Sequence, residues 1–384
     1  MHINLEELTI DQIHDYYKTG ELSCKHLVQG YLNRIEAFDK KGPYLNGVIN
    51  INKNALEEAD KVDQLISEKN FDQPLLGIPL LVKDQIETKD IITTFGSITC
   101  KDYLPDEDAT LIKLLKDAGA IILAKTTMPD FATSWFGYCS MNGTTKNPYN
   151  LDRHTGGSSS GTAAGVAANF ATAGIGEDTG GSIRVPACWS NLVGIKVTPG
   201  LISRSGMSAL VSFQDTPGPM TRNVLDCAKI LNVLTGYDPE DEYTFVSVIN
   251  GKKDYVKSIE DVNFKNCKIG ILRSSFGSDD DANCKPVNEV VNSYLSELKD
   301  HGANFVDVDI EGVYDLIVES SMYTEHSKYD MNNFLKSRKN IPYDDISTIV
   351  TEKQYHECLD LLEVINKESP EDPYSVPEYY KKYK

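Results

Sequence analysis

Hydrophobic and polar residues follow helical and strand periods in turn along this chain. Apolar residues recur at helical spacing over residues 23–38, and Ser23 is a suitable N-cap for that helix. Further helices are predicted over residues 55–66, 109–117, 162–171 and 287–298. Short apolar runs predict buried strands over residues 77–83, 120–124, 173–176, 268–272 and 304–308. Because helices and strands alternate, the pattern predicts an α/β fold whose helices cover a largely buried sheet.

The charge of the chain is strongly acidic. It has 57 Asp and Glu against 38 Lys and Arg among 384 residues, a net charge of −19. Such a balance argues against non-specific binding of nucleic acid or of anionic membranes. No stretch reaches the ~18 consecutive apolar residues that span a bilayer, and residues 1–7 lack the basic and apolar regions of a signal peptide. We therefore expect no nucleic-acid partner and no membrane span.

Cysteine and histidine spacing bears on compartment and metal binding. The eight cysteines contain no CxxC pair and are too sparse for a disulfide scaffold. We expect reduced thiols in a cytoplasmic protein. The seven histidines show no metal-ligand spacing, so we expect no metal site.

Two turns rich in glycine and serine, residues 155–161 and 177–187, flank one predicted helix and strand. The first turn lacks the GK[ST] ending of a phosphate-binding loop. The second is not the GxSxG turn of a Ser-His-Asp hydrolase, although His154 lies near in the sequence. Structural glycine turns and a serine nucleophile activated without histidine remain as alternatives.

A serine hydroxyl becomes a good nucleophile only when a base removes its proton. Lysine serves as that base when burial lowers its pKa enough to make it neutral. Lys83 ends an apolar strand, where a lysine has no packing role. The other interpretation, that its side chain extends to solvent at the strand end, stays open at this point.

Three elements of this sequence together resemble the amidase signature family. They are Lys83, the stretch Gly156-Gly157-Ser158-Ser159 with Gly161, and the stretch from Asp178-Thr179-Gly180-Gly181-Ser182 to Pro186-Ala187. Lys83 precedes Ser158 by 75 residues, and Ser158 precedes Ser182 by 24, as in the Ser-cisSer-Lys arrangement of that family. The resemblance extends over residues 20 to 310.

The resemblance implies an α/β/α layered fold with a large mixed sheet covered by helices. It implies a single amidase domain over residues 1–384, with the signature core at about residues 75–222. The C-terminal part is short compared with the family. No cofactor is implied.

The resemblance also implies roles for individual residues. Ser182 would be the nucleophile, Lys83 the base, and Ser158 the bridge between them. Backbone N–H groups would form the oxyanion hole at Thr179, Gly180 and Gly181. Supporting hydrogen bonds would come from Ser159, Asp178 and Arg184. The peptide bond between Gly157 and Ser158 would be cis.

The function implied is hydrolysis of a small-molecule carboxylic amide, which releases ammonia or an amine through an acyl-enzyme on Ser182. Two alternatives remain beside it. One is the glutaminase part of a glutamine-dependent amidotransferase, the A-type chain of that enzyme, and the other is a truncated, non-catalytic relative. A homodimer stays open as the assembly state.

Overall fold

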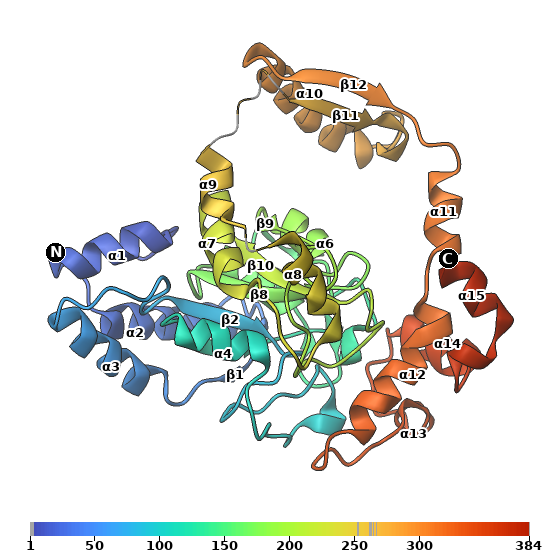
Figure 1. Cartoon of the computed structure of the whole chain (residues 1–384), viewed down its shortest axis with the longest axis horizontal. Coiled ribbons are helices and arrows are strands. Elements are labelled where there is room, and N and C mark those ends of the chain that lie inside the picture. The colour runs from blue at the N-terminus through green and yellow to red at the C-terminus, as the bar shows by residue number, and fades with distance from the viewer. Residues whose placement is uncertain (1–3, 252, 261–262, 264, 266, 384) are drawn as a thin grey trace. The chain divides into compact units, whose positions relative to one another are not determined.

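The computed structural model describes residues 4–251, 253–260, 263, 265 and 267–383 (Figure 1). The chain divides into two compact units. The first comprises residues 1–255 and 322–379, and the second comprises residues 256–321 and 380–384. The single domain expected over residues 1–384 stays a prediction.

A six-stranded mixed sheet forms the centre of the first unit, in the order β1-β3-β2-β8-β10-β9. Its strands are β1 (Val48–Ile51), β2 (Pro79–Lys83), β3 (Ile121–Thr126), β8 (Ala173–Asp178), β9 (Val193–Gly194) and β10 (Thr216–Thr221). β2 runs parallel to β3 and β8, whereas β1 and β10 pair antiparallel with their neighbours. The predicted α/β fold with a mixed sheet is confirmed.

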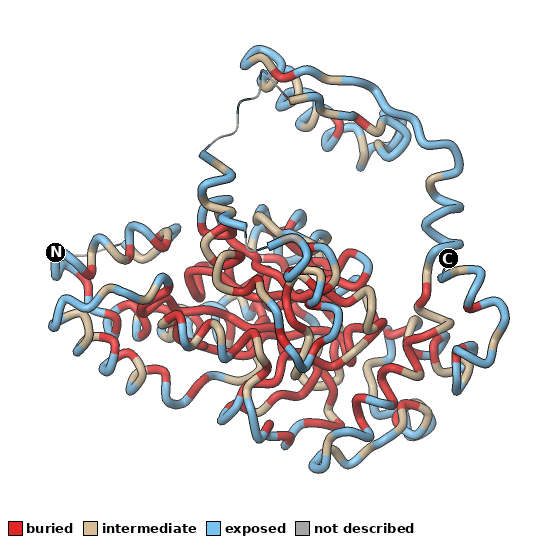
Figure 2. The backbone as a smooth tube through the Cα atoms, in the orientation of Figure 1, coloured by how far each residue is buried: buried red, intermediate tan, exposed pale blue. Residues whose placement is uncertain are grey.

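Apolar runs explain why the central strands are buried on both faces. Every residue of β2, β3 and β8 is buried, and Figure 2 shows this part of the backbone in red. Leu80, Leu81 and Val82 are each 0% exposed. Continuous burial of this kind is typical of parallel strands covered by helices on both sides.

Helices pack on this sheet and on one another. α5 packs against β2 and β8, α7 against β10, and α3 and α4 against β3. The helices of this unit are α1 (Ile10–Thr19), α2 (Cys24–Arg34), α3 (Ala55–Ser67), α4 (Thr110–Asp117), α5 (Ser160–Ala167), α6 (Arg184–Trp189), α7 (Val224–Leu234), α8 (Phe245–Asn250), α12 (Tyr323–Lys336), α13 (Ile346–Thr351) and α14 (Asp360–Glu368). Two helices continue past the boundary between the units, α9 (Tyr255–Glu260) and α15 (Pro377–Tyr383). Two short hairpins pair β4 (Tyr138–Cys139) with β5 (Gly143–Thr144) and β6 (Lys146–Asn147) with β7 (Asn150–His154).

The predicted first helix is present, and its N-cap is confirmed. The Ser23 hydroxyl accepts a hydrogen bond from the N–H of His26 at 3.1 Å. The helix continues beyond Arg34 as a π-helical turn to Asp39.

The helix predicted over residues 162–171 is shorter than expected and ends at Ala167. Asn169 adopts a left-handed conformation with φ of 57°. The N–H of Phe170 then donates to the carbonyl of Gly165 at 2.8 Å, and the N–H of Asn169 donates to that of Val166 at 3.1 Å. These two bonds form a Schellman motif, in which asparagine takes the position more often held by glycine.

The second unit is a strand-helix-strand motif. β11 (Lys268–Leu272) pairs parallel with β12 (Asn304–Val308), and α10 (Cys284–Asp300) connects them. α11 (Val313–Glu319) follows. The two strands match the predicted ranges, and α10 is longer at both ends than the predicted helix over residues 287–298.

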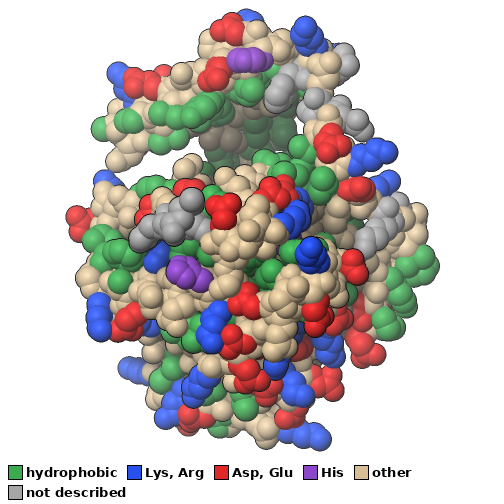
Figure 3. Space-filling model, turned by 90° about the vertical axis from the view of Figure 1, so that its left-hand side faces the viewer, with side chains coloured by type: hydrophobic (Ala, Val, Ile, Leu, Met, Phe, Trp, Pro, Cys, Tyr) green, Lys and Arg blue, Asp and Glu red, His purple; other side chains and the backbone are tan. Residues whose placement is uncertain are grey.

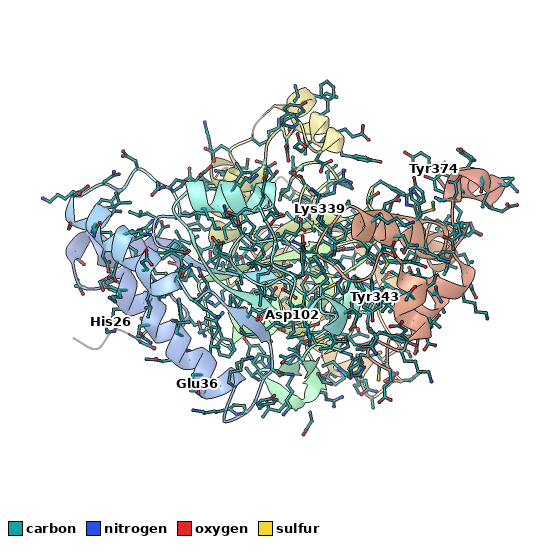
Figure 4. The ribbon with its side chains drawn as sticks, turned by 90° about the horizontal axis from the view of Figure 1, so that it is seen from below. His26, Glu36, Asp102, Lys339, Tyr343 and Tyr374 are labelled. Atoms are coloured by element: carbon teal, nitrogen blue, oxygen red, sulfur yellow. The ribbon has the colours of Figure 1, made fainter. Side chains whose placement is uncertain are left out.

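Acidic and basic side chains are interspersed over the face drawn in Figure 3. Figure 4 shows His26 and Glu36 on one flank of the first unit and Tyr343 and Tyr374 on the opposite flank. Among the described helices, none has the length and apolar character needed to cross a membrane.

Candidate active site

The parallel pairing of β2 and β8 places two oppositely charged residues side by side. Val82 pairs with Ile175 in the register of these strands. The ends of the two strands thus lie together, and the amine of Lys83 at the end of β2 reaches the carboxylate of Glu177 near the end of β8. The carboxyl ends of neighbouring strands are a common place for sites in α/β folds.

The two glycine-serine turns meet at these strand ends. The N–H of Ser159 donates to the carbonyl of Ser182 at 3.1 Å. The Ser159 hydroxyl donates to the carbonyl of Glu177 at 3.1 Å and accepts from its N–H at 3.2 Å. The peptide bond between Gly157 and Ser158 is cis, which confirms that expectation.

The turn that contains Ser158 leads directly into α5, and glycine allows this helix to lie close to its neighbours. A Cβ atom at Gly161 would lie 2.0 Å from the carbonyl oxygen of Gly47 and 2.4 Å from the backbone nitrogen of Thr127. A side chain at position 161 would therefore push the turn out of place.

Lys83 is completely buried, at 0% exposure, so the interpretation that its side chain reaches solvent is wrong. Its amine lies 2.8 Å from Oγ of Ser158, 2.8 Å from Oε2 of Glu177 and 3.2 Å from the carbonyl oxygen of Glu177. Burial lowers the pKa of Lys83 below its usual value, and the Glu177 carboxylate opposes part of this shift. Lys83 can therefore give up a proton more readily than an exposed lysine.

Ser182 is 3% exposed and follows Gly181, whose φ of 125° favours glycine. The carbonyl of Ser182 accepts the hydrogen bond from the N–H of Ser159. Within the described part of the chain, no side chain hydrogen-bonds the Ser182 hydroxyl. A proton transfer from Ser182 to Ser158 is therefore part of the proposed mechanism and not an observed contact.

Asp178 fixes the shape of the turn that carries Ser182. Its carboxylate accepts N–H groups from Gly181 at 2.7 Å, Ile183 at 3.1 Å and Arg184 at 3.2 Å. The Arg184 guanidinium binds both of its oxygens, at 3.0 and 3.1 Å. Burial alone would raise the pKa of Asp178, but these hydrogen bonds and the nearby cations outweigh it and lower the pKa to about 2.

The N–H groups predicted as an oxyanion hole are not equivalent in the structure. That of Gly181 already donates to Asp178. Those of Thr179 and Gly180 have no acceptor among the described residues. They remain available to a ligand.

A second carboxyl group approaches Glu177 through a threonine. The hydroxyl of Thr179 lies 2.8 Å from Oε1 of Glu177 and 2.6 Å from Oδ1 of Asp215. Burial, together with the charge of Glu177, raises the pKa of Asp215 to about 8. Lys83, Glu177 and Asp215, which can each bind a proton, are thus connected by a chain of hydrogen-bond contacts.

Aromatic side chains flank the turn of Gly180 and Gly181. The indole N–H of Trp135 donates to the carbonyl of Gly180 at 3.0 Å, and its ring contacts that of Tyr323 edge-on at 5.6 Å between centroids. Phe136 continues this surface and lies 6.2 Å from the ring of Trp189. Trp135, Phe136 and Trp189 are 38%, 41% and 47% exposed.

His154, the base of the alternative triad, lies with other aromatic residues. Its Nε2 is 3.1 Å from the hydroxyl of Tyr138, and its ring contacts that of Phe136. Both of these partners are aromatic side chains, and neither Ser158 nor Ser182 is among them.

Sequence reasoning missed Glu177, Asp215 and the aromatic residues of this site. A signal for Glu177 exists, since it lies one residue before the end of a strand, Lys83 ends another, and a parallel sheet can place such ends together. Tyr323 follows Gly180 by more than a hundred residues, and nothing in its local sequence indicates the contact. In the described ranges, no group of His, Cys, Asp and Glu side chains is arranged to hold a metal ion.

Comparison with known proteins gives a consistent result for nearly the whole chain. The family model described as Amidase matches residues 26–382. The glutamyl-tRNA(Gln) amidotransferase A subunit of Thermoanaerobacter pseudethanolicus is 36% identical over 335 residues, which cover 85% of this chain and 66% of that protein. Its counterpart in Alkaliphilus metalliredigens is 41% identical over 275 residues, which cover 71% and 55%. The chain spans about two thirds of the length of the first of these curated relatives and less of the second.

Solved structures resemble the fold closely. Native peptide amidase from Stenotrophomonas maltophilia superposes with a TM-score of 0.89 at 30% identity, over 98% of this chain and 78% of that one. An amidase family protein from Bacillus anthracis superposes with a TM-score of 0.81 at 33% identity, over 94% and 73%.

Proposed function

This chain belongs to the amidase family, and we propose that it hydrolyses carboxylic amides through an acyl-enzyme on Ser182. The observation that carries this proposal is the 2.8 Å contact between the amine of Lys83 and the hydroxyl of Ser158, at a turn bonded to the backbone of Ser182. A buried lysine with a lowered pKa next to a serine is a base placed beside its proton source.

In the proposed reaction, neutral Lys83 accepts the proton of Ser158, and Ser158 accepts that of Ser182. The Ser182 oxygen then bonds to the amide carbon, and the carbonyl electron pair moves onto oxygen. When the tetrahedral intermediate collapses, the C–N bond breaks and the Lys83 proton returns through Ser158 to the leaving nitrogen. An amine leaves poorly unless it is protonated, so this return is essential for amides. Water then hydrolyses the ester on Ser182 by the same route.

We assign the oxyanion to the free N–H groups of Thr179 and Gly180. Two preorganised backbone donors stabilise the negative charge that develops on oxygen. Gly181 keeps its bond to Asp178 and gives the turn its shape. Asp178 and Arg184 therefore fix the turn that carries Ser182. Ser159 links the turn of residues 155–161 to it through its hydrogen bond to the carbonyl of Ser182.

The exposed aromatic residues beside this turn favour an amide with a bulky apolar or aromatic substituent. Trp135 contacts the backbone of Gly180, so its ring lies next to the place assigned to the oxyanion. Apolar lining with few polar groups is typical of sites for small organic ligands. We propose such amides as the substrate class.

The second candidate is the glutaminase part of a glutamine-dependent amidotransferase. The names of the relatives favour it, because those cited at 36% and 41% identity belong to glutamyl-tRNA(Gln) amidotransferases. A glutamine substrate also needs partners for its ammonium and carboxylate groups. Arg184 is half-exposed in this region, but it is paired with Asp178. The aromatic surface therefore favours the hydrolase.

The decisive experiment labels the protein with an alkyl fluorophosphonate and measures its intact mass. We expect one adduct, which Ser182→Ala abolishes. Ser160→Ala is the matched control, since Ser160 is a buried serine at the first position of α5 and has no role in the mechanism. An unlabelled wild-type protein would contradict the proposal.

Ammonia release separates the two candidates. Glutamine and a primary amide with an aromatic side group, such as 3-phenylpropanamide, are compared at equal concentration. Faster release from the aromatic amide supports the hydrolase. Faster release from glutamine supports the amidotransferase.

A further inference from the structure

We propose that Glu177 is a positioning residue for Lys83, which aims the amine at Ser158 and balances the charge of the ammonium formed during the reaction. This inference rests on the proposed function, because it requires Lys83 to act as a base. Neither the glycine-serine motifs nor the resemblance assigned a role to Glu177.

The contacts of the amine determine where its lone pair points. Both hydrogen bonds other than that to Ser158 go to Glu177, one to Oε2 at 2.8 Å and one to the carbonyl oxygen at 3.2 Å. A neutral amine has two N–H groups and one lone pair, and an ionised carboxylate and a carbonyl can only accept. When these two oxygens take both N–H groups, the lone pair is left facing the Ser158 hydroxyl.

The same carboxylate stabilises the ammonium that follows proton transfer. The side chains of Lys83 and Glu177 are both completely buried, at 0% exposure. An unpaired charge at such a place is strongly unfavourable, whereas a pair in hydrogen-bond contact is tolerated. Glu177 thus acts on lysine as a carboxylate acts on the histidine of a Ser-His-Asp triad.

Asp215 contacts Glu177 through the hydroxyl of Thr179. One hydroxyl hydrogen lies between Oε1 of Glu177 and Oδ1 of Asp215, at 2.8 and 2.6 Å from the Thr179 oxygen. A hydroxyl donates only once, so both contacts are hydrogen bonds only if one of the two acids is protonated. The pair then holds one proton and one negative charge between them, as closely spaced carboxyl groups do.

Other charged groups near Lys83 are already balanced or neutral. Asp178 pairs with Arg184, and Lys196 lies 3.7 Å from Oδ1 of Asp178. Burial raises the pKa of Tyr323, so its phenol is neutral at ordinary pH. Among the described residues, Glu177 is the acid in direct contact with the amine.

Two substitutions separate the acid that contacts Lys83 from the acid behind it. Glu177→Gln removes the adjacent charge, so Lys83 should lose its proton at a lower pH, by roughly one unit. Asp215→Asn keeps Glu177 and removes an acid that reaches it only through Thr179, so it should lower the pH at which Lys83 loses its proton by less.

The experiment titrates Lys83 directly in the full chain. Protein labelled with ¹³Cε-lysine is followed by NMR over a pH series, with Lys83→Ala used to assign the resonance. The pH dependence of fluorophosphonate labelling of Ser182 is measured in parallel. Glu87→Gln is the matched control, because Glu87 is a buried glutamate bound at 2.7 Å by both Nε and Nη2 of Arg338.

A downward shift in Glu177→Gln that exceeds the shift in Asp215→Asn, with no shift in Glu87→Gln, supports the inference. A Lys83 titration unchanged by Glu177→Gln overturns it, as does an equal or larger shift in Asp215→Asn. If Glu177→Gln does not fold, Glu177→Asp decides: it draws the carboxylate back from the amine, and an unchanged Lys83 titration there overturns the inference. Absence of Ser182 labelling in the wild type contradicts the proposed function instead, and the NMR titration still reports on Glu177.

Discussion

The hydroxyl of Tyr323 fills the space that a side chain at position 180 would need. A Cβ atom on Gly180 would lie 2.4 Å from this oxygen, and the next nearest atom, Cζ of Tyr323, would lie at 3.4 Å. Tyr323 comes from α12, far along the chain from the turn that it contacts. With a side chain at position 180, either Tyr323 or the turn would therefore have to move.

Gly180 itself is exposed, but a methyl group there would overlap the Tyr323 hydroxyl, so Gly180→Ala should destabilise the protein by roughly 1 kcal/mol, the lower end of the range for overpacking. It should also slow amide hydrolysis, since the turn has to move. Adding Tyr323→Phe removes the clashing oxygen and leaves an ordinary contact. Chemical denaturation of both single variants and the double variant tests this. Equal and additive losses would contradict the steric explanation.

Lys83→Ala should lower kcat/KM for an amide by roughly 100- to 10,000-fold, the usual contribution of a general acid–base. An activated ester should be affected less, because its leaving group needs no proton. Lys83→Arg should not restore activity, since a guanidinium stays charged. Ser182→Ala should abolish both reactions.

These lysine and serine variants are assayed on a paired amide and ester, after circular dichroism has shown that each is folded. Near-normal amide hydrolysis by Lys83→Ala would remove lysine from the mechanism. The base would then have to be sought elsewhere, beginning with His154.

Trp135→Ala should lower kcat/KM for an aromatic amide by about tenfold and change that for acetamide much less, because only the larger substrate reaches the indole ring. Trp135→Phe is the matched control: it keeps an aromatic ring and removes the N–H that donates to Gly180. Equal losses on both substrates would show that Trp135 acts through the turn and not through the substrate.

Asp178 makes stability depend on pH in the acid range. Its pKa of about 2 in the folded protein lies below the value of about 3.9 expected when unfolded. The carboxylate therefore stabilises the fold fully above about pH 5, by roughly 2 to 3 kcal/mol, and this contribution is lost as the pH falls toward 2. The free energy of unfolding of Asp178→Asn should accordingly approach that of the wild type between pH 4 and pH 2. The same substitution at exposed Asp152 should leave the profile unchanged.

Cysteine reactivity should follow burial. All eight cysteines are free thiols. Burial raises the pKa of Cys24, Cys100 and Cys139 to about 12, so these hold little thiolate at neutral pH. Iodoacetamide should first modify exposed Cys188 and Cys358, and peptide mapping identifies the sites. Rapid modification of Cys24 in the folded protein would contradict the buried position.

The sequence by itself determined the elements and the local turns. Apolar spacing predicted the strand that ends at Lys83 and the helix that Ser23 caps, since both patterns depend on near neighbours in the chain. The glycine-serine motifs with Lys83 indicated the family, which the match over residues 26–382 established. The early end of α5 was missed because an asparagine at the glycine position of a Schellman motif is a weak signal.

Only the tertiary structure decided what surrounds the reactive groups. The pairing of β2 with β8 brings the ends of these strands together, and neither strand alone specifies that the amine of Lys83 will meet the carboxylate of Glu177. Asp215 reaches Glu177 through Thr179 because the segment before β10 returns antiparallel to β8. Tyr323 meets Gly180 only when α12 packs against the first unit's core. Local periods fix which face of an element is buried, whereas contacts between distant segments depend on sheet order and register, which are settled only when the chain packs together.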